Sequence, residues 1–278
     1  MSLTGTGALV DAARDAGRGV GAFNVITVEH AEGIVAGGEL AGAPVILQIS
    51  QNAVRYHGGR AEPLAAACAR LAETAGVPVA LHLDHVDDLD LLHRAADAGF
   101  GSVMYDASRL GYADNVAATR SAADWSHANG LWIEAELGEV GGKDGVHSPT
   151  ARTKPAEAAE YVSGTGVDAL AVAVGSSHAM TVKSARLDIG LIDEIRAAVP
   201  VPLVLHGSSG VLDDDLRQAV AAGLTKINVG TQLNVAFTAA VRDALADPGL
   251  TDPRRYLRPA RDGVAAAVAG ILRTVSGG

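Results

Sequence analysis

Eight short runs of apolar, largely β-branched residues recur along the chain, and this repetition limits the possible folds more than any other feature. The runs start roughly 24 to 38 residues apart and cover residues 19–26, 44–50, 77–84, 102–106, 131–137, 169–175, 202–207 and 226–231. Between them lie Ala-rich segments with helical periodicity, several of which end in glycine, a common residue just beyond a helix. This alternation predicts parallel strands joined by crossover helices.

Eight strand–helix units of this length predict an α/β fold, the closed (β/α)8 or TIM barrel. The alternative is a doubly wound open sheet, which eight regular units without a break in composition disfavour. The chain of 278 residues has no linker or low-complexity segment, so we expect one barrel domain over residues 1–278. We also expect a long mobile loop in the first half of residues 138–166, and a helical extension from about residue 252 that begins with an arginine-rich turn.

Composition narrows the class of protein. Acidic residues outnumber basic ones 32 to 22, for a formal charge of −10, which disfavours non-specific nucleic-acid binding. The single cysteine, Cys68, excludes an intrachain disulfide and a zinc site built from several cysteines. No run of about 18 apolar residues could span a membrane, and the N-terminus carries charges where a signal peptide is apolar. We therefore expect a cytoplasmic α/β enzyme without nucleic-acid or membrane partners.

Functional residues of such barrels lie where the strands end, and three of the nine histidines fall there. His85, His178 and His206, with Glu136, form a possible His₃ or His₃Glu cluster. Three imidazoles with an open position suit a catalytic Zn²⁺. Asp84, beside the first histidine, could orient a ligand, act as a general acid or base, or be an ordinary surface acid; spacing alone does not choose among these.

Two further patterns at the strand ends indicate a charged ligand. Glu134 and Glu136 share one strand face, and buried acids need a cation, either a metal or an arginine inside the barrel. Short Gly/Ser/Thr turns, GSSG at 207–210 and NVGT at 228–231, follow the last two strands. Backbone N–H groups in such turns bind anions, and this is a common phosphate position in barrels.

Five segments together resemble those of the class II, zinc-dependent ketose-bisphosphate aldolases, which include fructose- and tagatose-bisphosphate aldolases. The segments are ALHLDHVDDLD, IEAELGEVGGKDG, AVAVGSSHAM, VPLVLHGSSG and KINVGT, and the resemblance runs from about residue 21 to 261. It implies a reversible cleavage of a ketose 1,6-bisphosphate to dihydroxyacetone phosphate and glyceraldehyde 3-phosphate. It also implies a homodimer or homotetramer, a catalytic Zn²⁺, and often a supporting Na⁺ or K⁺.

The resemblance assigns roles to individual residues. Asp84 matches the acid/base for the C4 hydroxyl, and Asp144 is the one residue that could serve as the catalytic acid of the mobile loop. The metal would be held by His85, His178 and His206, with Glu136 and Asp106 as alternative or second ligands. Substrate and phosphate binding falls to Asn24, Ser50, Lys183, Gly207, Ser209, Asn228, Thr231 and, from a neighbouring subunit, Arg254.

Departures from the family pattern keep other interpretations open. Ala179 and Gly230 stand where many members have Gly and Asp, and Asp144 stands near the position of a loop glutamate. One alternative is a related aldolase acting on a 6-phospho-5-dehydro-2-deoxy-gluconate-like substrate. Another is a non-catalytic protein that binds sugar phosphates. A Schiff-base aldolase is disfavoured, because none of the four lysines ends a strand; Lys226 is expected at the start of the last one.

Overall fold

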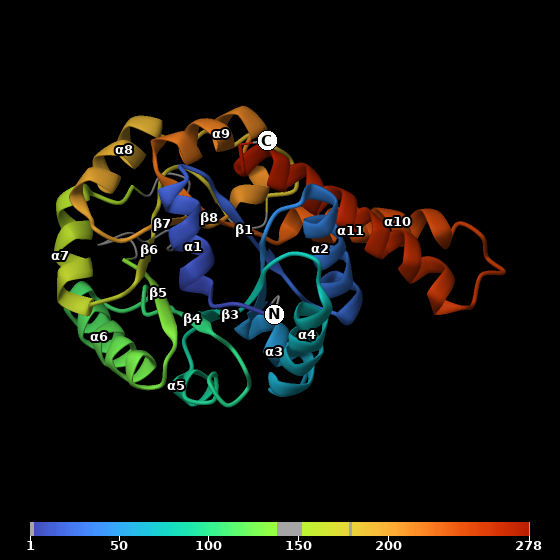
Figure 1. The fold of residues 1–278 in the computed structure, drawn as a ribbon, viewed down its shortest axis with the longest axis horizontal. Coiled ribbons are helices and arrows are strands. Elements are labelled where there is room, and N and C mark those ends of the chain that lie inside the picture. The colour runs from blue at the N-terminus through green and yellow to red at the C-terminus, as the bar shows by residue number, and fades with distance from the viewer. Residues whose placement is uncertain (1–2, 138–151, 178–179, 278) are drawn as a thin grey trace.

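The computed structural model describes residues 3–137, 152–177 and 180–277, and in it the eight predicted strands form a closed parallel barrel (Figure 1). Each strand pairs with the next, and β1 pairs with β8 to close the ring. The predicted (β/α)8 fold is thereby confirmed. The strands are β1 Val20–Asn24, β2 Val45–Ser50, β3 Val79–Val86, β4 Ser102–Tyr105, β5 Trp132–Glu136, β6 Ala169–Ala171, β7 Leu203–Leu205 and β8 Leu224–Val229.

Helices surround the barrel, and the Ala-rich periodic segments supply most of them. Gly166 ends α7 in the left-handed conformation, with φ of 71°, as a helix-terminating glycine should. None of the described helices is long and apolar enough to cross a membrane. The helices around the ring are α2 Val28–Ala41, α3 Gln51–Tyr56, α4 Glu62–Thr74, α5 Leu89–Leu92, α6 Tyr112–Ala128, α7 Pro155–Thr165, α8 Ile189–Ala198, α9 Asp213–Ala222 and the 3₁₀ turn η1 Ser208–Gly210.

Helix α1 (Thr6–Asp15) covers the amino-terminal end of the barrel. Its buried Leu9 and Val10 form one apolar cluster with Val20, Ile46 and Ala80, which point inward from three strands. Removing this apolar surface from water stabilises the closed end by roughly 25 cal/mol for each Å² buried. Helix α1 does not cover the opposite end, where the strands finish and where functional residues of such barrels lie.

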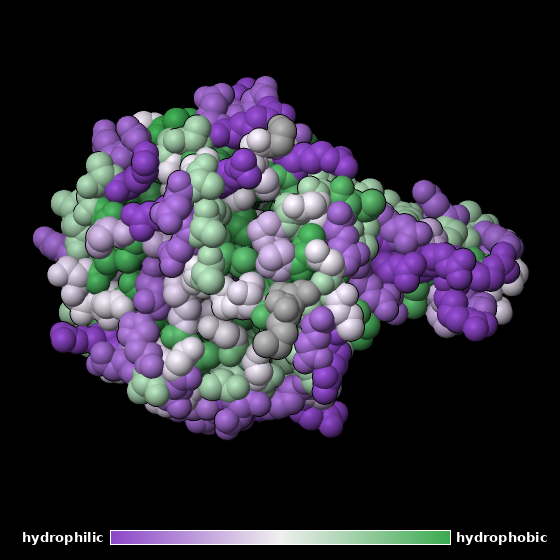
Figure 2. All heavy atoms as spheres, viewed as in Figure 1, coloured by the Kyte–Doolittle hydropathy of each residue, from purple (hydrophilic) through white to green (hydrophobic). Residues whose placement is uncertain are grey.

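Helices α10 (Thr231–Ala244) and α11 (Pro253–Val275) run out from the barrel as a projecting arm (Figure 1). The prediction of an arginine-rich turn before the last helix was wrong, because that segment is already helical. Asp252 caps the helix by accepting a hydrogen bond from the Arg254 N–H at 3.0 Å, and Pro253 occupies the first helical position. Both are helix-start signals. The tip of the arm is strongly hydrophilic (Figure 2).

Candidate active site

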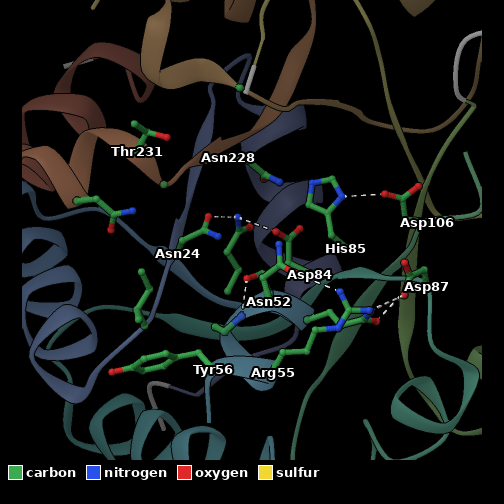
Figure 3. Close-up of a pocket in the computed structure, with 18 of the residues that line it drawn as sticks. Asn24, Asn52, Arg55, Tyr56, Asp84, His85, Asp87, Asp106, Asn228 and Thr231 are labelled. Atoms are coloured by element: carbon green, nitrogen blue, oxygen red, sulfur yellow. Dashed lines mark hydrogen bonds and ion pairs between the residues drawn. The ribbon is translucent and has the colours of Figure 1, made fainter. Parts of the chain in front are cut away.

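A cavity of about 660 Å³ opens at the carboxyl ends of the strands (Figure 3). The cavity brings together predicted site residues that are up to 207 positions apart, from residue 24 to residue 231. Several of them lie on the barrel wall and others on the loops that follow. The predicted residues that line it are Asn24, Ser50, Asp84, His85, Asp106, Gly207, Ser209, Asn228 and Thr231.

An irregularity in β3 explains how two consecutive residues both face this cavity. Neighbours in a regular strand point to opposite faces, yet Asp84 and His85 both line the cavity. Pairing with β4 passes from Leu83 opposite Val103 to Val86 opposite Tyr105, so β3 holds one extra residue. His85 takes a left-handed conformation there, with φ of 50°. Such a conformation costs on the order of 1–3 kcal/mol for a residue other than glycine and is typical of functional sites.

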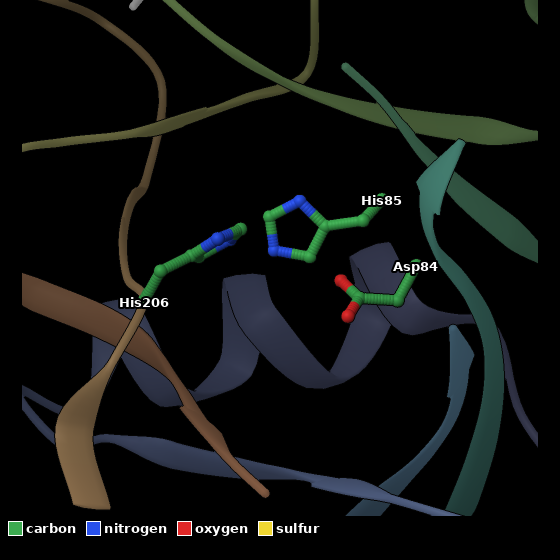
Figure 4. A group of neighbouring side chains, drawn as sticks. All are labelled: Asp84, His85 and His206. Carbon is green, nitrogen blue, oxygen red and sulfur yellow. The ribbon is translucent and has the colours of Figure 1, made fainter. Parts of the chain in front are cut away.

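The imidazoles of His85 and His206 meet edge to face above Asp84, with ring centroids 4.7 Å apart (Figure 4). One donor atom from each of these three residues lies within 4.8 Å of the others, and His85, Asp106 and Glu136 form a second group of this kind. His178, the third predicted histidine ligand, lies outside the described residues. Imidazole nitrogens and carboxylate oxygens in this mixture suit a divalent transition metal.

Each histidine is held by a carboxylate on one nitrogen, which orients its other nitrogen. Asp106 Oδ2 lies 3.1 Å from His85 Nδ1, and Glu134 Oε1 lies 2.8 Å from His206 Nε2. The remaining nitrogen of His206, Nδ1, is 4.0 Å from Glu136 Oε2. Carboxylates that fix the tautomer of a histidine in this way are typical of metal sites.

The electrostatics of this cluster also favour a bound cation. Burial and the nearby Asp106 charge raise the pKa of Glu136 to about 8. Burial opposes protonation of His85, but the Asp84 charge and the hydrogen bond to Asp106 raise the pKa of His85 to about 10. Acids crowded in this way attract positive charge, and a divalent ion would supply it in place of protons. The residues present therefore fit a metal ion.

Asp84 is buried beside the histidines, and its two oxygens have different surroundings. Oδ2 lies 3.4 Å from the donor Nε2 of Gln48, which also donates to Asn24 Oδ1 at 2.6 Å. Oδ1 accepts no hydrogen bond from the described residues and lies 3.9 Å from His82 Nε2. Burial and the Lys226 charge lower the pKa of His82 to about 3, so this ring is neutral. Asp84 thus lines the cavity as a buried carboxylate whose side chain is held by Gln48.

The two turns after β7 and β8 lie at the wall of the cavity. Gly207 follows His206 with φ of 65°, a conformation that glycine adopts without strain. Ser209 Oγ accepts a hydrogen bond at 3.1 Å from the backbone N–H of Gln232, at the start of α10. A side chain at Gly230 would crowd Asn24, since a Cβ there would lie 3.2 Å from its amide carbon. The turns thus bring backbone close to the cavity without filling it.

Two of the described site residues predicted from the sequence, Lys183 and Arg254, lie apart from the cavity. Lys183 forms an ion pair with Asp213 instead. Arg254 lies near the tip of the arm, where it pairs with Asp252. Asp144 lies outside the described residues, as does His178. The roles assigned to these four residues remain predictions.

Sequence reasoning missed two groups that the structure places at the site. Arg55 and Arg109 line the cavity and are the two described lining residues with a permanent positive charge. Arg55 could have been predicted from the sequence, because it is a basic residue about one turn into the helix that follows a strand. The second group is Lys226, which was expected at the start of the last strand but is the third residue of β8 and pairs with Glu134 inside the barrel. Glu134 is thus paired with a lysine, and not with the metal or the arginine expected from the sequence.

Comparisons with known proteins identify the family of this chain. The family model described as fructose-bisphosphate aldolase class-II matches residues 4–277. The chain belongs to this family. Among curated relatives, it is 39% identical to the fructose-bisphosphate aldolase of Geobacillus stearothermophilus, covering 98% of this chain and 96% of that one. It is 38% identical to the probable fructose-bisphosphate aldolase of Bacillus subtilis, covering 98% and 97%.

Solved structures show the same relationship. The YdjI aldolase of Escherichia coli K12 superposes on this class II aldolase with a TM-score of 0.85 at 31% identity, over 98% of this chain and 97% of that one. A putative fructose-1,6-biphosphate aldolase from Coccidioides immitis gives a TM-score of 0.85 at 29% identity, over 96% and 94%. The predicted aldolase family and reaction class are confirmed.

Proposed function

We propose that this aldolase reversibly cleaves fructose 1,6-bisphosphate to dihydroxyacetone phosphate and glyceraldehyde 3-phosphate, with Zn²⁺ as its metal. The observation that carries the proposal is one cavity lined by metal-ligand groups, a buried carboxylate and two glycine-containing turns. Relatives that share 38–39% of its residues are named for the fructose substrate.

The histidine and carboxylate groups of the site support zinc as the metal. His85 and His206 would hold it together with the predicted ligand His178, and Glu136 and Asp106 offer alternative positions within the second donor group. A zinc ion with three imidazole ligands keeps a position for substrate. When bound, it would polarise the C2 carbonyl of the ketose and so favour cleavage of the C3–C4 bond.

Asp84 is the proposed base of the cleavage direction. Its carboxylate would take the proton of the C4 hydroxyl as the C3–C4 bond breaks, which releases the aldehyde product, and would return the proton in the condensation direction. The bond to Gln48 keeps the carboxylate aimed at the cavity. The other product needs a proton at C3, for which Asp144 of the loop is the predicted donor. Each proton transferred in cleavage thus has a proposed acceptor or donor on this chain.

The phosphates would bind at the two ends of the cavity. The backbone of the turn at Gly207 to Ser209, with Asn228 and Thr231, would hold the phosphate next to the ketose carbonyl. Ser50 and the guanidinium of Arg55 lie on the β2–α3 side and would meet the second phosphate. Two arginines in an otherwise acidic wall favour a substrate with more than one anionic group.

Arg254 supports a homodimer as the assembly. It lies near the tip of the projecting arm, away from the cavity of its own chain. We infer that the Arg254 of a second copy reaches the second phosphate, as the family pattern implies. Sedimentation at assay concentrations tests this, because a monomer with full activity would contradict it.

A coupled cleavage assay tests the proposed reaction. Purified enzyme is assayed on fructose and on tagatose 1,6-bisphosphate, before and after chelation, with Zn²⁺ added back. Loss of cleavage on chelation and recovery with zinc is the expected result, with fructose 1,6-bisphosphate the faster substrate. A faster reaction with the tagatose epimer, or cleavage that survives chelation, would contradict the proposal. Binding of zinc without turnover of either substrate would favour a carboxylate-bearing substrate or a non-catalytic role.

A further inference from the structure

A lysine lies entirely inside the barrel, below the proposed active site. Lys226 is the third residue of β8, its side chain is 0% exposed, and it points to the barrel interior like Asn228 two residues later. Burying an ammonium group is costly unless strong partners replace its water. The partners that Lys226 uses are therefore informative about its role.

The first partner connects Lys226 to the metal-ligand group. Its Nζ donates to Glu134 Oε2 at 2.7 Å, and the other oxygen of that carboxylate lies 2.8 Å from His206 Nε2. Both oxygens of Glu134 are thus engaged, one by the lysine and one by the histidine ring. The side chain of Glu134 is also 0% exposed. The orientation of His206 depends on where the lysine holds this carboxylate.

The second partner connects Lys226 to the substrate side of the cavity. Nζ also donates to Asn228 Oδ1, at 2.8 Å. Asn228 lines the cavity, and within the described parts of the chain its Nδ2 has no hydrogen-bond partner. By engaging the oxygen, the lysine determines which end of the amide faces the cavity, and it presents the donor end (Figure 3).

We propose that Lys226 is a positioning residue that uses one buried ammonium to orient both the metal ligand His206, through Glu134, and the substrate-facing amide of Asn228. The inference builds on the proposed function, because it takes His206 as a ligand and the cavity as the substrate site. This arrangement needs a group with at least two N–H donors, since it must donate to a carboxylate and to an amide oxygen at once. An apolar residue of the same volume would fill the space but orient neither group.

The test compares Lys226→Met with the wild type in two measurements. The first is the affinity of the metal-free protein for Zn²⁺, measured by competition with a chromophoric chelator. The second is the separate determination of KM and kcat after loading with zinc. The matched control is Lys154→Met, the same change at a lysine whose side chain is 70% exposed.

We expect Lys226→Met to weaken zinc binding by about 10–100-fold, as loss of supporting groups does at other metal sites. We also expect KM to rise by roughly 3- to 10-fold, as for Asn228→Ala, because both variants lose the oriented amide. Zinc affinity and KM that match the wild type in a folded Lys226→Met protein would overturn the proposal, even if its thermal stability were lower. Lys154→Met should match the wild type in both measurements.

Lys226→Met leaves the Glu134 charge unpaired in the interior and could prevent folding. The same substitution is therefore also made in a Glu134→Gln protein. In Glu134→Gln the lone charge is removed, and the double variant with Lys226→Met contains no unpaired buried ion. Adding Lys226→Met to Glu134→Gln is expected to raise KM by the same factor as Asn228→Ala, and no rise would overturn the proposal. The zinc titration uses no substrate, so it tests Lys226 even if the enzyme fails to cleave fructose 1,6-bisphosphate.

Discussion

At the scale of single residues, the site depends on one extra residue in β3. The bulge turns His85 into the cavity next to Asp84, although the two are consecutive in the strand. The left-handed backbone of His85 works against stability by on the order of 1–3 kcal/mol. Surrounding contacts, including the bond to Asp106, hold it in place. The metal-ligand group and the proposed base thus share one short segment.

Asp84→Asn is expected to retain zinc and lose most cleavage activity. The amide keeps the size of the carboxylate, so the metal-ligand histidines stay in place, but it cannot accept the C4 hydroxyl proton. General acid–base catalysis contributes about 10²–10⁴-fold, and kcat should fall by that factor. Steady-state kinetics on protein of measured zinc content checks this. Asp124→Asn on the exposed side of α6 is the control, and a kcat within twofold of the wild type for Asp84→Asn would exclude it as the base.

Cys68 is expected to be unreactive in the native protein. Its thiol is 0% exposed within α4, and burial raises its pKa to about 12. A raised pKa keeps the thiol protonated at pH 8, and the thiolate is the reactive form. Ellman's reagent at pH 8 should therefore label none of the native protein within an hour and one thiol per chain after denaturation. Rapid labelling of the folded enzyme would contradict this burial.

At the scale of elements, the segment from β2 into α3 forms one side of the cavity. Ser50 ends the strand and caps the helix, accepting a hydrogen bond from the Ala53 N–H at 3.2 Å. One turn later Arg55 lies 3.3 Å from Asp87, which follows β3 (Figure 3). A six-residue helix thus carries a hydroxyl and a guanidinium to the same wall. The two side chains give this wall of the cavity polar groups that suit an anion.

Arg55→Ala is expected to raise KM for fructose 1,6-bisphosphate by roughly 10–100-fold, with a smaller effect on kcat. A hydrogen bond to a charged group contributes about 1.5–3 kcal/mol, which corresponds to that range. Kinetics on the bisphosphate check this, with Arg70→Ala as a control on α4, where the arginine side chain is 81% exposed. An unchanged KM for Arg55→Ala would remove this arginine from the phosphate site.

At the scale of the whole molecule, barrel closure assembles the site from distant parts of the chain. His206 and Glu134 are 72 residues apart, and Lys226 and Glu134 are 92 apart, yet each pair is in hydrogen-bond contact. The metal-ligand groups come from β3, β5 and the segments after β4 and β7. They exist as a group only in the folded state, so binding of the proposed metal there would be thermodynamically linked to folding.

Removal of zinc is therefore expected to lower the melting temperature. At free zinc one hundred times its dissociation constant, binding to the folded state alone adds about 2.7 kcal/mol. For a chain of this size that corresponds to roughly 5–10 °C. Calorimetry of chelated and zinc-loaded enzyme checks the shift. His206→Ala should show little response to zinc, and a full response in that variant would contradict its assignment as a ligand.

The sequence by itself determined the barrel and nine of the 20 residues that line the cavity. Strand runs, helical periods and terminating glycines are local patterns, and a parallel barrel places every strand end at one rim. The histidine and aspartate candidates followed from that rule, and the aldolase family from the ordered segments that resemble it.

Tertiary structure decided the features that depend on contacts between strands. The bulge at His85 is a matter of register between β3 and β4, and no periodicity within one segment encodes it. The sequence left a metal or an arginine as the partner of Glu134, and the folded interior places Lys226 beside it instead. Sequence patterns report how each segment folds, whereas the energy of a buried charge depends on which distant group replaces its lost water.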